Sequence, residues 1–425
     1  MITTQLITCG IFIFAYAIIV FFHRLRTWAV WGSVFLYLVL NVFEPKDIIL
    51  YIDWNILGVL LGTSIVAELF IYSKIPAYIA ERLVDRTRSL LSALLVLSSF
   101  TGLLSAFIEN VSTTLIMAPI AFEIAAKQKT SPVPFIMGIC LSANLQGTAT
   151  LVGDPPSMIL AAHTNMSFND FFVFNSKPGL FFAVQIGALA SLGILYLLYR
   201  KTNKPFIPIV PEKVISWIPG IILLLLIFSL VFVSFFRNRI GNIAGVICLL
   251  YALVAVLYAQ ISKKFNDGRY KIIKTADFGT VFFLAGIFCL VGALRKTGII
   301  HLLADKLGLL LQGNLLGVYA LLTLSSMIIS GFVDNIPYFA AVVGVISNLA
   351  ETFAYPKYLL LFGTIIATTV GGNITPIGAS ANIVGTGLLR KRGYKLTFWD
   401  FMKIGLPFSL VATLAASLFL WIFWH

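Results

Sequence analysis

Two short polar motifs interrupt long apolar stretches of this 425-residue chain, and their residue types are those that bind small cations. The first is Ser105-Ala-Phe-Ile-Glu-Asn-Val111 and the second is Ser330-Gly-Phe-Val-Asp-Asn-Ile336. Carboxylate and amide oxygens are ligands that hard cations prefer. Ionisable residues within apolar stretches of membrane length are costly and mark functional pathways. We therefore expect an ion or solute site at these two motifs.

Two glycine-rich segments, Asn144–Ser157 and Gly371–Asn382, follow the polar motifs and interrupt apolar stretches in the same way. The first contains Gly153-Asp-Pro-Pro156 and the second contains Thr375-Pro-Ile-Gly378. Since proline removes a backbone donor and glycine permits left-handed backbone, each segment predicts a helix that is broken within the membrane. Carbonyl groups exposed at such a break bind cations, and exposed amide groups attract anions. One site can therefore serve both kinds of charge.

The candidate ion- and substrate-binding residues lie either at the tip of a polar motif or at the break of a helix. They are Glu109, Asn110, Ser112, Thr113, Gly147, Thr148, Thr150, Gly153, Asp154, Asp334, Asn335, Gly372, Asn373, Thr375, Gly378, Ser380 and Asn382. No catalytic residue is expected, because the chain has no phosphate-binding loop, zinc-binding helix motif or nucleophile elbow. We expect no enzyme and no organic cofactor, and Na+ or H+ is the expected coupling ion.

Four other titratable residues are expected to have no part in the site. Glu68 and Glu123 fall nearer predicted helix ends, where a long side chain reaches polar surroundings or pairs with a basic residue. His163 and His301 are expected in or next to loops, in contact with water. The cysteines lie within apolar stretches and lack the spacing of a metal site or a disulfide framework.

The elements that position these motifs are membrane helices. Hydrophobic residues make up 59% of the chain, charged residues make up 11%, and the mean hydropathy is +0.97, which excludes an ordinary soluble domain. Apolar blocks long enough to cross a bilayer predict spans near 4–22, 27–43, 54–72, 134–162, 179–199, 214–236, 241–261, 278–294, 357–388 and 404–424. Two interrupted stretches, 89–127 and 307–351, predict re-entrant helical hairpins. The expected fold class is an all-α polytopic membrane protein.

The polar motifs belong to an internal repeat. Asn110 and Asn335 lie 225 positions apart, the glycines of the two breaks keep the same spacing, and Asp53 and Asp277 lie 224 apart. The number of spans between Asp53 and Asp277 is odd, so the second copy is inverted relative to the first. The expected organisation is N-terminal scaffold helices in 1–52, repeat 1 in 53–200, a linker with scaffold helices in 201–276, and repeat 2 in 277–425.

Basic residues concentrate in short loops between apolar blocks, so the net charge of +13 indicates membrane orientation rather than nucleic-acid binding. These loops are His23–Arg26, Lys74–Arg88, Arg200–Lys213, Lys263–Lys274 and Arg390–Lys403. The positive-inside rule places all five on the cytoplasmic side. We expect an integral protein of a bacterial or archaeal inner (plasma) membrane. Its expected partners are the lipid bilayer and a small ion or solute, and no nucleic acid.

At these motifs the chain resembles the ion transporter superfamily, in the branch that holds arsenite permeases, sodium/proton antiporters of the NhaD type and the pink-eyed dilution P protein. The resemblance rests on Leu104-Ser-Ala-Phe-Ile-Glu-Asn-Val111, Gly153-Asp-Pro-Pro-Ser157, Val333-Asp-Asn-Ile-Pro337 and the segment Gly371–Asn382. It implies an elevator mechanism, in which hairpins and broken helices slide against a scaffold that forms a homodimer. In the dicarboxylate branch both tips carry Ser-Asn-Thr, and the acidic tips of this chain depart from that pattern.

The resemblance also implies sodium sites at Asn110 with Gly153 and at Asn335 with Gly378, with the substrate between the tips. We therefore predict a secondary active transporter that couples a Na+ or H+ gradient to the movement of a small anion or neutral solute. The acidic tips equally suit a Na+/H+ antiporter without an organic substrate. The sequence also leaves open an arsenite or antimonite efflux permease and an ion channel.

Overall fold

The computed structural model describes residues 2–202, 204–207, 212–236, 243–262, 265, 277–310 and 314–425. The expected basic loop Lys263–Lys274 lies outside these ranges apart from Phe265. The helical membrane fold is confirmed, and the strands of the described part form one small antiparallel hairpin, β1 (Val173–Phe174) with β2 (Lys177–Pro178). Short 3-10 helices, η1 (His23–Leu25), η2 (Asn169–Phe171) and η3 (Arg200–Thr202), join some of the longer helices.

Seven helices of the described part are long and apolar enough to cross a membrane. They are α1 (Ile2–Phe21), α4 (Trp54–Tyr72), α10 (Leu180–Tyr199), α13 (Ala244–Ile261), α15 (Phe278–Lys296), α19 (Lys357–Gly371) with η5 (Gly372–Ile374), and α21 (Phe398–Trp424). Two expected spans are shorter: 27–43 is the 14-residue α2 (Arg26–Val39), and 214–236 is the 17-residue α11 (Ile218–Ser234). The chain leaves α2 at Asn41, whose positive φ of 54° cannot continue a helix, and enters α3 (Pro45–Tyr51).

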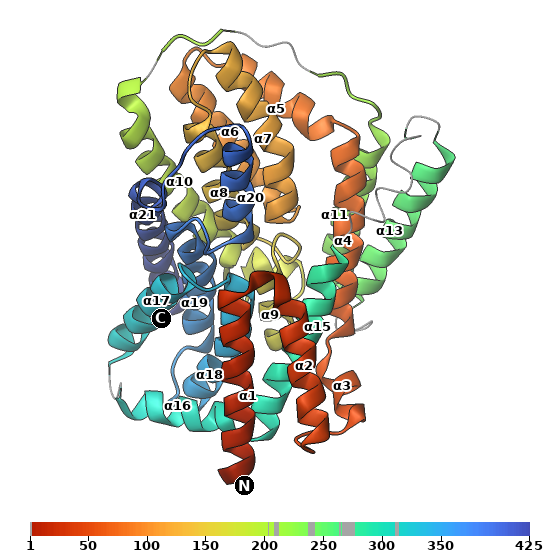
Figure 1. Cartoon of the computed structure of the whole chain (residues 1–425), viewed down its shortest axis with the longest axis vertical. Coiled ribbons are helices and arrows are strands. Elements are labelled where there is room, and N and C mark those ends of the chain that lie inside the picture. Colours follow the sequence, from red (N-terminus) through yellow and green to blue (C-terminus); the bar gives the residue numbers. More distant parts are fainter. Residues whose placement is uncertain are drawn as a thin grey trace.

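Two helical hairpins enter the molecule from opposite ends and meet near its middle (Figure 1). Hairpin 1 consists of α6 (Leu90–Ser105) and α7 (Asn110–Lys127), and hairpin 2 consists of α17 (Leu315–Ser330) and α18 (Asn335–Thr352). Hairpin 2 begins at Leu315 rather than at residue 307, because the Asn314 side chain caps α17 by accepting a hydrogen bond from a backbone N–H at 3.1 Å. Residues 307–310 belong instead to α16 (Ile299–Leu310).

The two broken helices lie where the glycine-rich segments predict them. The first consists of α8 (Val133–Gly147) and α9 (Pro155–Thr164), and the second consists of α19, η5 and α20 (Ser380–Lys391). Pro155 and Pro156 occupy the first turn of α9, where a helix has no intrahelical partner for the missing N–H group. The expected spans 134–162 and 357–388 are therefore each made of two half-helices.

The two repeats begin with the same local structure. Asp53 caps α4 by accepting a hydrogen bond from a backbone N–H at 3.0 Å, and Asp277 caps α15 in the same way at 2.9 Å. After these helices the chain turns through Lys74 (φ 61°) and Gly298 (φ 75°), which also lie 224 positions apart. Each turn leads into a short helix, α5 (Ile75–Asp85) or α16, at opposite ends of the molecule (Figure 1). Helix α5 therefore occupies part of the expected loop Lys74–Arg88.

The described residues of three expected cytoplasmic loops, Lys74–Arg88, Arg200–Lys213 and Arg390–Lys403, lie at one end of the molecule. The backbone N–H of Leu90 donates to the carbonyl of Lys204 at 2.8 Å, and the guanidinium of Arg392 lies 4.2 Å from the ring centre of Phe122. These contacts join the ends of hairpin 1 to the loops that follow α10 and α20. The loop expected at His23–Arg26 does not join them, because α1 ends beside the tip of hairpin 2.

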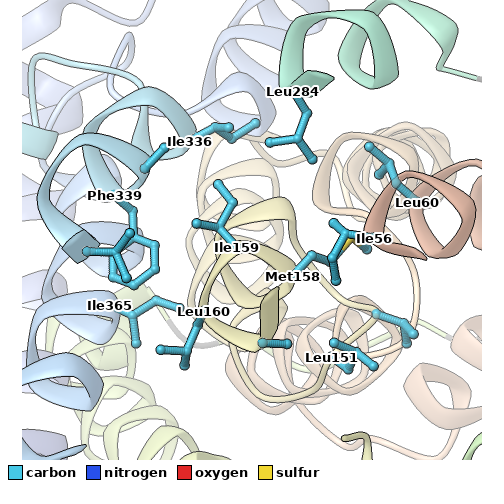
Figure 2. Close-up of a cluster of buried hydrophobic side chains, with 14 of the residues drawn as sticks. Ile56, Leu60, Leu151, Met158, Ile159, Leu160, Leu284, Ile336, Phe339 and Ile365 are labelled. Carbon is cyan, nitrogen blue, oxygen red and sulfur yellow. The ribbon is translucent and has the colours of Figure 1, made fainter. Parts of the chain in front are cut away.

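The centre of the molecule is an apolar cluster around α9 (Figure 2). Met158, Ile159 and Leu160 of α9 lie between α4 on one side and α18 and α19 on the other. The neighbouring helices contribute Ile56, Leu60, Phe339 and Ile365, and all seven of these side chains are at most 3% exposed. Helix α9 is thus buried from Pro155 to Ala161, which holds the first break in place.

Outside this cluster, close glycine contacts join the scaffold helices to the repeats. Helix α4 packs along α13, where a Cβ on Gly58 would lie 3.0 Å from the Cα of Gly245 and a Cβ on Gly62 would overlap the backbone of Cys248. Helix α10 packs along α21 in a similar way, with Gly187 facing the carbonyl of Ala412. Small residues allow membrane helices to approach this closely.

We expect Gly62→Ala to destabilise the protein, because the added Cβ would overlap backbone atoms that cannot move aside. Overpacking of this kind costs about 1–3 kcal/mol, so the thermal midpoint of the purified protein in detergent should fall. Gly193→Ala on α10 is the matched control, since open space surrounds Gly193 and alanine favours a helix. Equal midpoints for the two variants would contradict the close packing of α4 on α13.

Candidate functional site

Each hairpin turns through a carboxylate that caps its second helix. Glu109 precedes α7, and its Oε2 accepts hydrogen bonds from the backbone N–H groups of Val111 and Ser112, each at 3.0 Å. Asp334 precedes α18, and its Oδ1 accepts from the N–H of Ile336 at 3.1 Å. A carboxylate in this position satisfies free N–H groups and interacts favourably with the helix dipole. The N-termini of α7 and α18 are therefore each capped by a carboxyl group of the protein itself.

The asparagines that follow these carboxylates are buried and make different contacts. Ser105 Oγ donates to Asn110 Oδ1 at 2.9 Å, within hairpin 1. Asn335 Nδ2 instead donates to Asp154 Oδ2 at 3.2 Å, and Asp154 lies at the break of the other repeat. Hairpin 2 is therefore tied directly to the first broken helix. Position 379, which matches Asp154 in repeat 2, is Ala379, so this tie has no counterpart.

At each helix break, one threonine donates a hydrogen bond to the neighbouring hairpin. Thr150 Oγ1 donates to the carbonyl of Ala106, where α6 ends, and Thr375 Oγ1 donates to the carbonyl of Gly331, where α17 ends. Each hydroxyl also accepts from the N–H two residues further on, at 3.3 Å. The two threonines lie 225 positions apart, so the tertiary contacts follow the repeat. Backbone groups at a break inside a membrane need such partners.

Glycine at the two breaks lets carbonyl groups converge. A Cβ on Gly153 would lie 2.9 Å from the carbonyl oxygens of both Ser105 and Ala106. A Cβ on Gly378 would lie 2.7 Å from the carbonyl oxygen of Gly331. Since side-chain atoms do not tolerate such distances, only glycine fits. Each break therefore presents carbonyl oxygens from a hairpin end, which is the ligand type that binds sodium at unwound membrane helices.

The two broken helices touch at a pair of polar contacts that the repeat relates. Asn144 Nδ2 donates to Asn373 Oδ1 at 2.8 Å, and Thr148 Oγ1 donates to Thr369 Oγ1 at 2.6 Å. Thr369 matches Asn144 in the repeat, and Asn373 matches Thr148, so the second contact is the image of the first. Asn382 joins the group by accepting from Asn144 at 3.0 Å. The local two-fold axis of the repeats therefore passes between α8 and α19.

A cavity of about 460 Å³, the first cavity, opens beside the tip of hairpin 1. It is lined by Arg26, Glu68, Glu109, Val111, Ser112, Leu115, Pro155, Asp277, Thr280, Ile336, Ser380, Ile383 and Val384. Among the described residues, three carboxylates and one guanidinium face this space, so its lining attracts cations. A small pocket of about 10 Å³, room for one water-sized group, lies between Glu109, Gly153 and Asp154.

Arg26, Glu68 and Asp277 are functional candidates that the sequence does not assign to the site. Glu68 is expected near a helix end, but α4 places it on the wall of the first cavity. Arg26 is expected in a cytoplasmic loop, but its Nη1 lies 3.6 Å from Asp334 Oδ2 at the tip of hairpin 2. The repeat spacing points to Asp277. No sequence signal identifies Arg26, because its position depends on where α1 and α2 meet within the fold.

A second cavity, of about 150 Å³, is lined by Tyr51, Asp53, Ile159, Ala162, His163, Phe288, Val291, Gly292, Arg295, Ala340 and Val343. His163 lies next to a loop, as expected, but it is half-buried rather than solvated. His163 lies at the end of α9, its Nε2 is 2.7 Å from Ser347 Oγ, and its Nδ1 is 3.5 Å from Arg295 Nη2. His301 is exposed, as expected.

The two cavities are images of each other under the inverted repeat. Four pairs of lining residues are repeat mates: Asp277 with Asp53, Glu68 with Gly292, Leu115 with Ala340, and Val384 with Ile159. Helices α7 and α20, which line the first cavity, lie in the upper half of Figure 1, whereas α9 and α18, which line the second, lie in the lower half. The same structural elements thus form a cavity in each half of the molecule.

The predicted site residues divide into two groups. Those at the tips, the break glycines or the first cavity are Glu109, Asn110, Ser112, Gly147, Gly153, Asp154, Asp334, Asn335, Gly372, Gly378 and Ser380. Those whose side chains hold the hairpins and breaks together are Thr113, Thr148, Thr150, Asn373, Thr375 and Asn382. Thr113, for example, is fully buried and donates to the carbonyl of Ile108 at 3.3 Å.

Comparison with known proteins identifies transporters. Residues 16–361 match the family model described as citrate transporter (CitMHS). The chain is 30% identical over 383 residues to an uncharacterized transporter of Mycobacterium tuberculosis (strain ATCC 25618 / H37Rv), covering 87% of this chain and 86% of that protein. It is 23% identical over 444 residues to the P protein of Mus musculus, covering 85% of this chain and 53% of that protein.

A solved structure shares the fold. The YdaH transporter of Alcanivorax borkumensis superimposes with a TM-score of 0.58 at 15% sequence identity. The match covers 87% of this chain and 84% of that chain. At this identity the likeness concerns the arrangement of the helices.

We expect Thr150→Val and Thr375→Val to lower the thermal midpoint by similar amounts, because each removes the hydroxyl that pins a break. A buried carbonyl left without its donor costs about 1–3 kcal/mol. Thr150→Ser and Thr375→Ser keep the hydroxyl, so their thermal midpoints should be close to that of the unmodified protein. Valine variants that melt like the serine variants would show that these contacts add no stability.

Proposed function

Because this chain belongs to the citrate transporter family, we propose that it is a secondary active transporter driven by a Na+ or H+ gradient. The solute that it moves across the membrane is a small anion or a neutral molecule. The family resemblance predicted from the hairpin and break motifs is confirmed by this membership and by the similarity to P proteins. The chain is thus a membrane transporter, and its coupling ion, solute and movement form the proposal.

The pair of cavities built from repeat mates is the observation that carries the proposal. A transporter must expose one site to each side of the membrane in turn, and an inverted repeat provides two states of matching construction. Leu115 in the first cavity is 49% exposed, whereas its mate Ala340 in the second cavity is 2% exposed. In this proposal the first cavity, of about 460 Å³, is the wide access route and the second, of about 150 Å³, is the narrow one.

Helices α7 and α20, which line the first cavity, lie in the same half of the molecule as three of the basic loops (Figure 1). With these loops in the cytoplasm, the described state is the inward-facing one. The outward-facing state then follows from an elevator movement of the hairpins and broken helices along the scaffold of α1, α2, α11 and α13. We place the protein in a bacterial or archaeal inner membrane as a homodimer formed through this scaffold.

The coupling cations bind, in this proposal, at Asn110 with Gly153 and at Asn335 with Gly378. Carbonyl groups of a hairpin end converge on each glycine. Asn110 is buried and accepts from Ser105, whose carbonyl faces Gly153, and Asn335 is buried at the tip of hairpin 2. The solute then binds between the tips, next to Glu109 and in reach of the first cavity. We do not carry the citrate of the family's description to this chain, because its acidic tips differ from the Ser-Asn-Thr tips of the dicarboxylate branch.

Na+/H+ antiport without an organic solute is the second candidate. Glu68, Glu109 and Asp277 line the first cavity and outnumber the one cationic residue among its described lining residues. Carboxylates at membrane depth form proton relays in pumps and transporters, and the same groups bind sodium. Arsenite efflux has less support, since none of the four cysteines, all of them in the described part of the chain, lines either cavity.

We expect Asn110→Ala and Asn335→Ala each to weaken sodium binding at least about tenfold, since a tenfold change corresponds to the loss of one good ligand interaction of about 1.4 kcal/mol. The measurement is the rise of the thermal midpoint during a sodium titration at constant ionic strength. Asn348→Ala is the matched control, because Asn348 lies on α18 away from the tip, where its side chain donates to the carbonyl of Gly344. If the sodium concentration at half-saturation is the same in both tip variants as in the unmodified protein, the assigned ion sites are ruled out.

We expect cysteines placed at the repeat mates Leu115 and Ala340 to react from opposite sides of the membrane. The test uses Leu115→Cys and Ala340→Cys in a background without the four native cysteines, with a membrane-impermeant maleimide and vesicles of each orientation. Leu115→Cys should react from the cytoplasmic side without ions, and Ala340→Cys should react from the outer side under transport conditions. Leu97→Cys, at a position that is 1% exposed, is the unreactive control. Reaction of both mates from one side would contradict alternating access.

A further inference from the structure

Arg26 is the only cationic residue that lines the first cavity among the described residues. It begins α2, and α15 holds its guanidinium in place. Nη2 donates to Thr280 Oγ1 at 3.2 Å, and Cζ lies 4.9 Å from the ring centre of Phe283. A guanidinium over an aromatic face is electrostatically favourable. These two contacts fix the position of the cation on the cavity wall.

The other terminal nitrogen of Arg26 has an ion-pair partner but no hydrogen bond. Nη1 is buried, and no hydrogen-bond acceptor lies within reach of it in the described part of the chain. Its neighbour Asp334 is 3.6 Å away, an ion pair without a hydrogen bond, and Asp334 already uses its other oxygen to cap α18. A buried donor without an acceptor costs free energy, which a bound anionic oxygen would recover.

The N-termini of the two tip helices, α7 and α18, are capped by carboxylates of the protein itself. Helix N-termini attract anions when they are free. Here Glu109 accepts from two N–H groups of α7, and Asp334 accepts from one N–H group of α18. An anion that enters between the tips therefore meets carboxylates at both N-termini. The guanidinium of Arg26 is the cationic partner that the first cavity offers it. The N-terminus of α20, which no side chain caps and whose Ser380 lines the same cavity, lies on the cavity wall as a neutral donor.

We propose that Arg26 binds one carboxylate or oxyanion group of the transported solute, in exchange for its ion pair with Asp334. The inference rests on the proposed function and names its substrate class. The planar fork of the guanidinium matches the two oxygens of a carboxylate. One guanidinium opposes the carboxylates of Glu68, Glu109 and Asp277, so the site accepts a solute with one anionic group and repels a di- or trianion.

The experiment compares Arg26→Gln, Arg26→Lys and Arg24→Gln. Arg24 lies two residues before Arg26 and is exposed, so Arg24→Gln is the matched control. The thermal midpoint is followed first with sodium alone, and then with acetate, lactate, phosphate, succinate or citrate at saturating sodium. The thermal midpoints of the unmodified protein and of Arg24→Gln should rise with sodium and should rise further when a monoanion is added. Arg26→Gln should keep the sodium response and need at least about tenfold more anion, and Arg26→Lys should fall between, since lysine keeps the charge but not the fork.

The failure of this inference differs from the failure of the proposed function. If the thermal midpoint of the unmodified protein changes with neither sodium nor pH, the proposed function is contradicted. A cation response without any anion response, an anion response that Arg26→Gln keeps at the same half-saturating concentration, or tighter binding of citrate than of any monoanion would overturn the role of Arg26.

Asp334→Asn tests the same inference when Arg26→Gln does not fold. Removing the charge of Asp334 frees the guanidinium from its ion pair. The monoanion concentration that gives half-saturation, measured at saturating sodium, should therefore fall several-fold. An unchanged or higher half-saturating concentration would overturn the exchange of Asp334 for the solute.

Discussion

The need to satisfy backbone hydrogen bonds inside a membrane shapes the centre of this protein. Two helices break there, and hydrocarbon offers no partner to the freed N–H and C=O groups. Thr150 and Thr375 supply one hydroxyl at each break, and Glu109 and Asp334 supply one carboxylate at each hairpin tip. Tips and breaks therefore form one connected polar unit. The surrounding helices can be apolar because this unit satisfies its own polar groups.

The repeat explains why the polar unit is nearly symmetric, and the charged residues explain why its two halves differ. Backbone caps and threonine ties recur at the spacing of the repeat. Some titratable side chains do not: Glu68 of the first cavity matches Gly292, and His163 of the second matches Leu388. Two cavities of common construction thus carry different charges. This allows the two faces of one transporter to treat the same ion or solute differently.

In the described part of the chain, few polar contacts join the N-terminal helices to hairpin 2. Tyr16 donates to the carbonyl of Pro337 at 2.7 Å, and Arg26 pairs with Asp334 at 3.6 Å. By contrast, α9 is enclosed by apolar side chains from α4, α18 and α19 (Figure 2). Apolar contacts have no preferred direction, so surfaces of this kind can slide, whereas the polar contacts must break and form again. In the proposed elevator movement, these two polar contacts are the ones that hairpin 2 would have to break.

Composition and spacing along the chain were enough to predict the membrane class, the inverted repeat, the two hairpins and the two helix breaks, because these features depend on local pattern. The tip residues Glu109 and Asp334 were also predictable, since a carboxylate within an apolar stretch is conspicuous. The folded structure alone revealed that Arg26, Glu68 and His163 line cavities, and that Thr148 and Asn373 join the two broken helices. The depth and neighbours of such a side chain depend on how distant helices pack, and no local pattern contains that information.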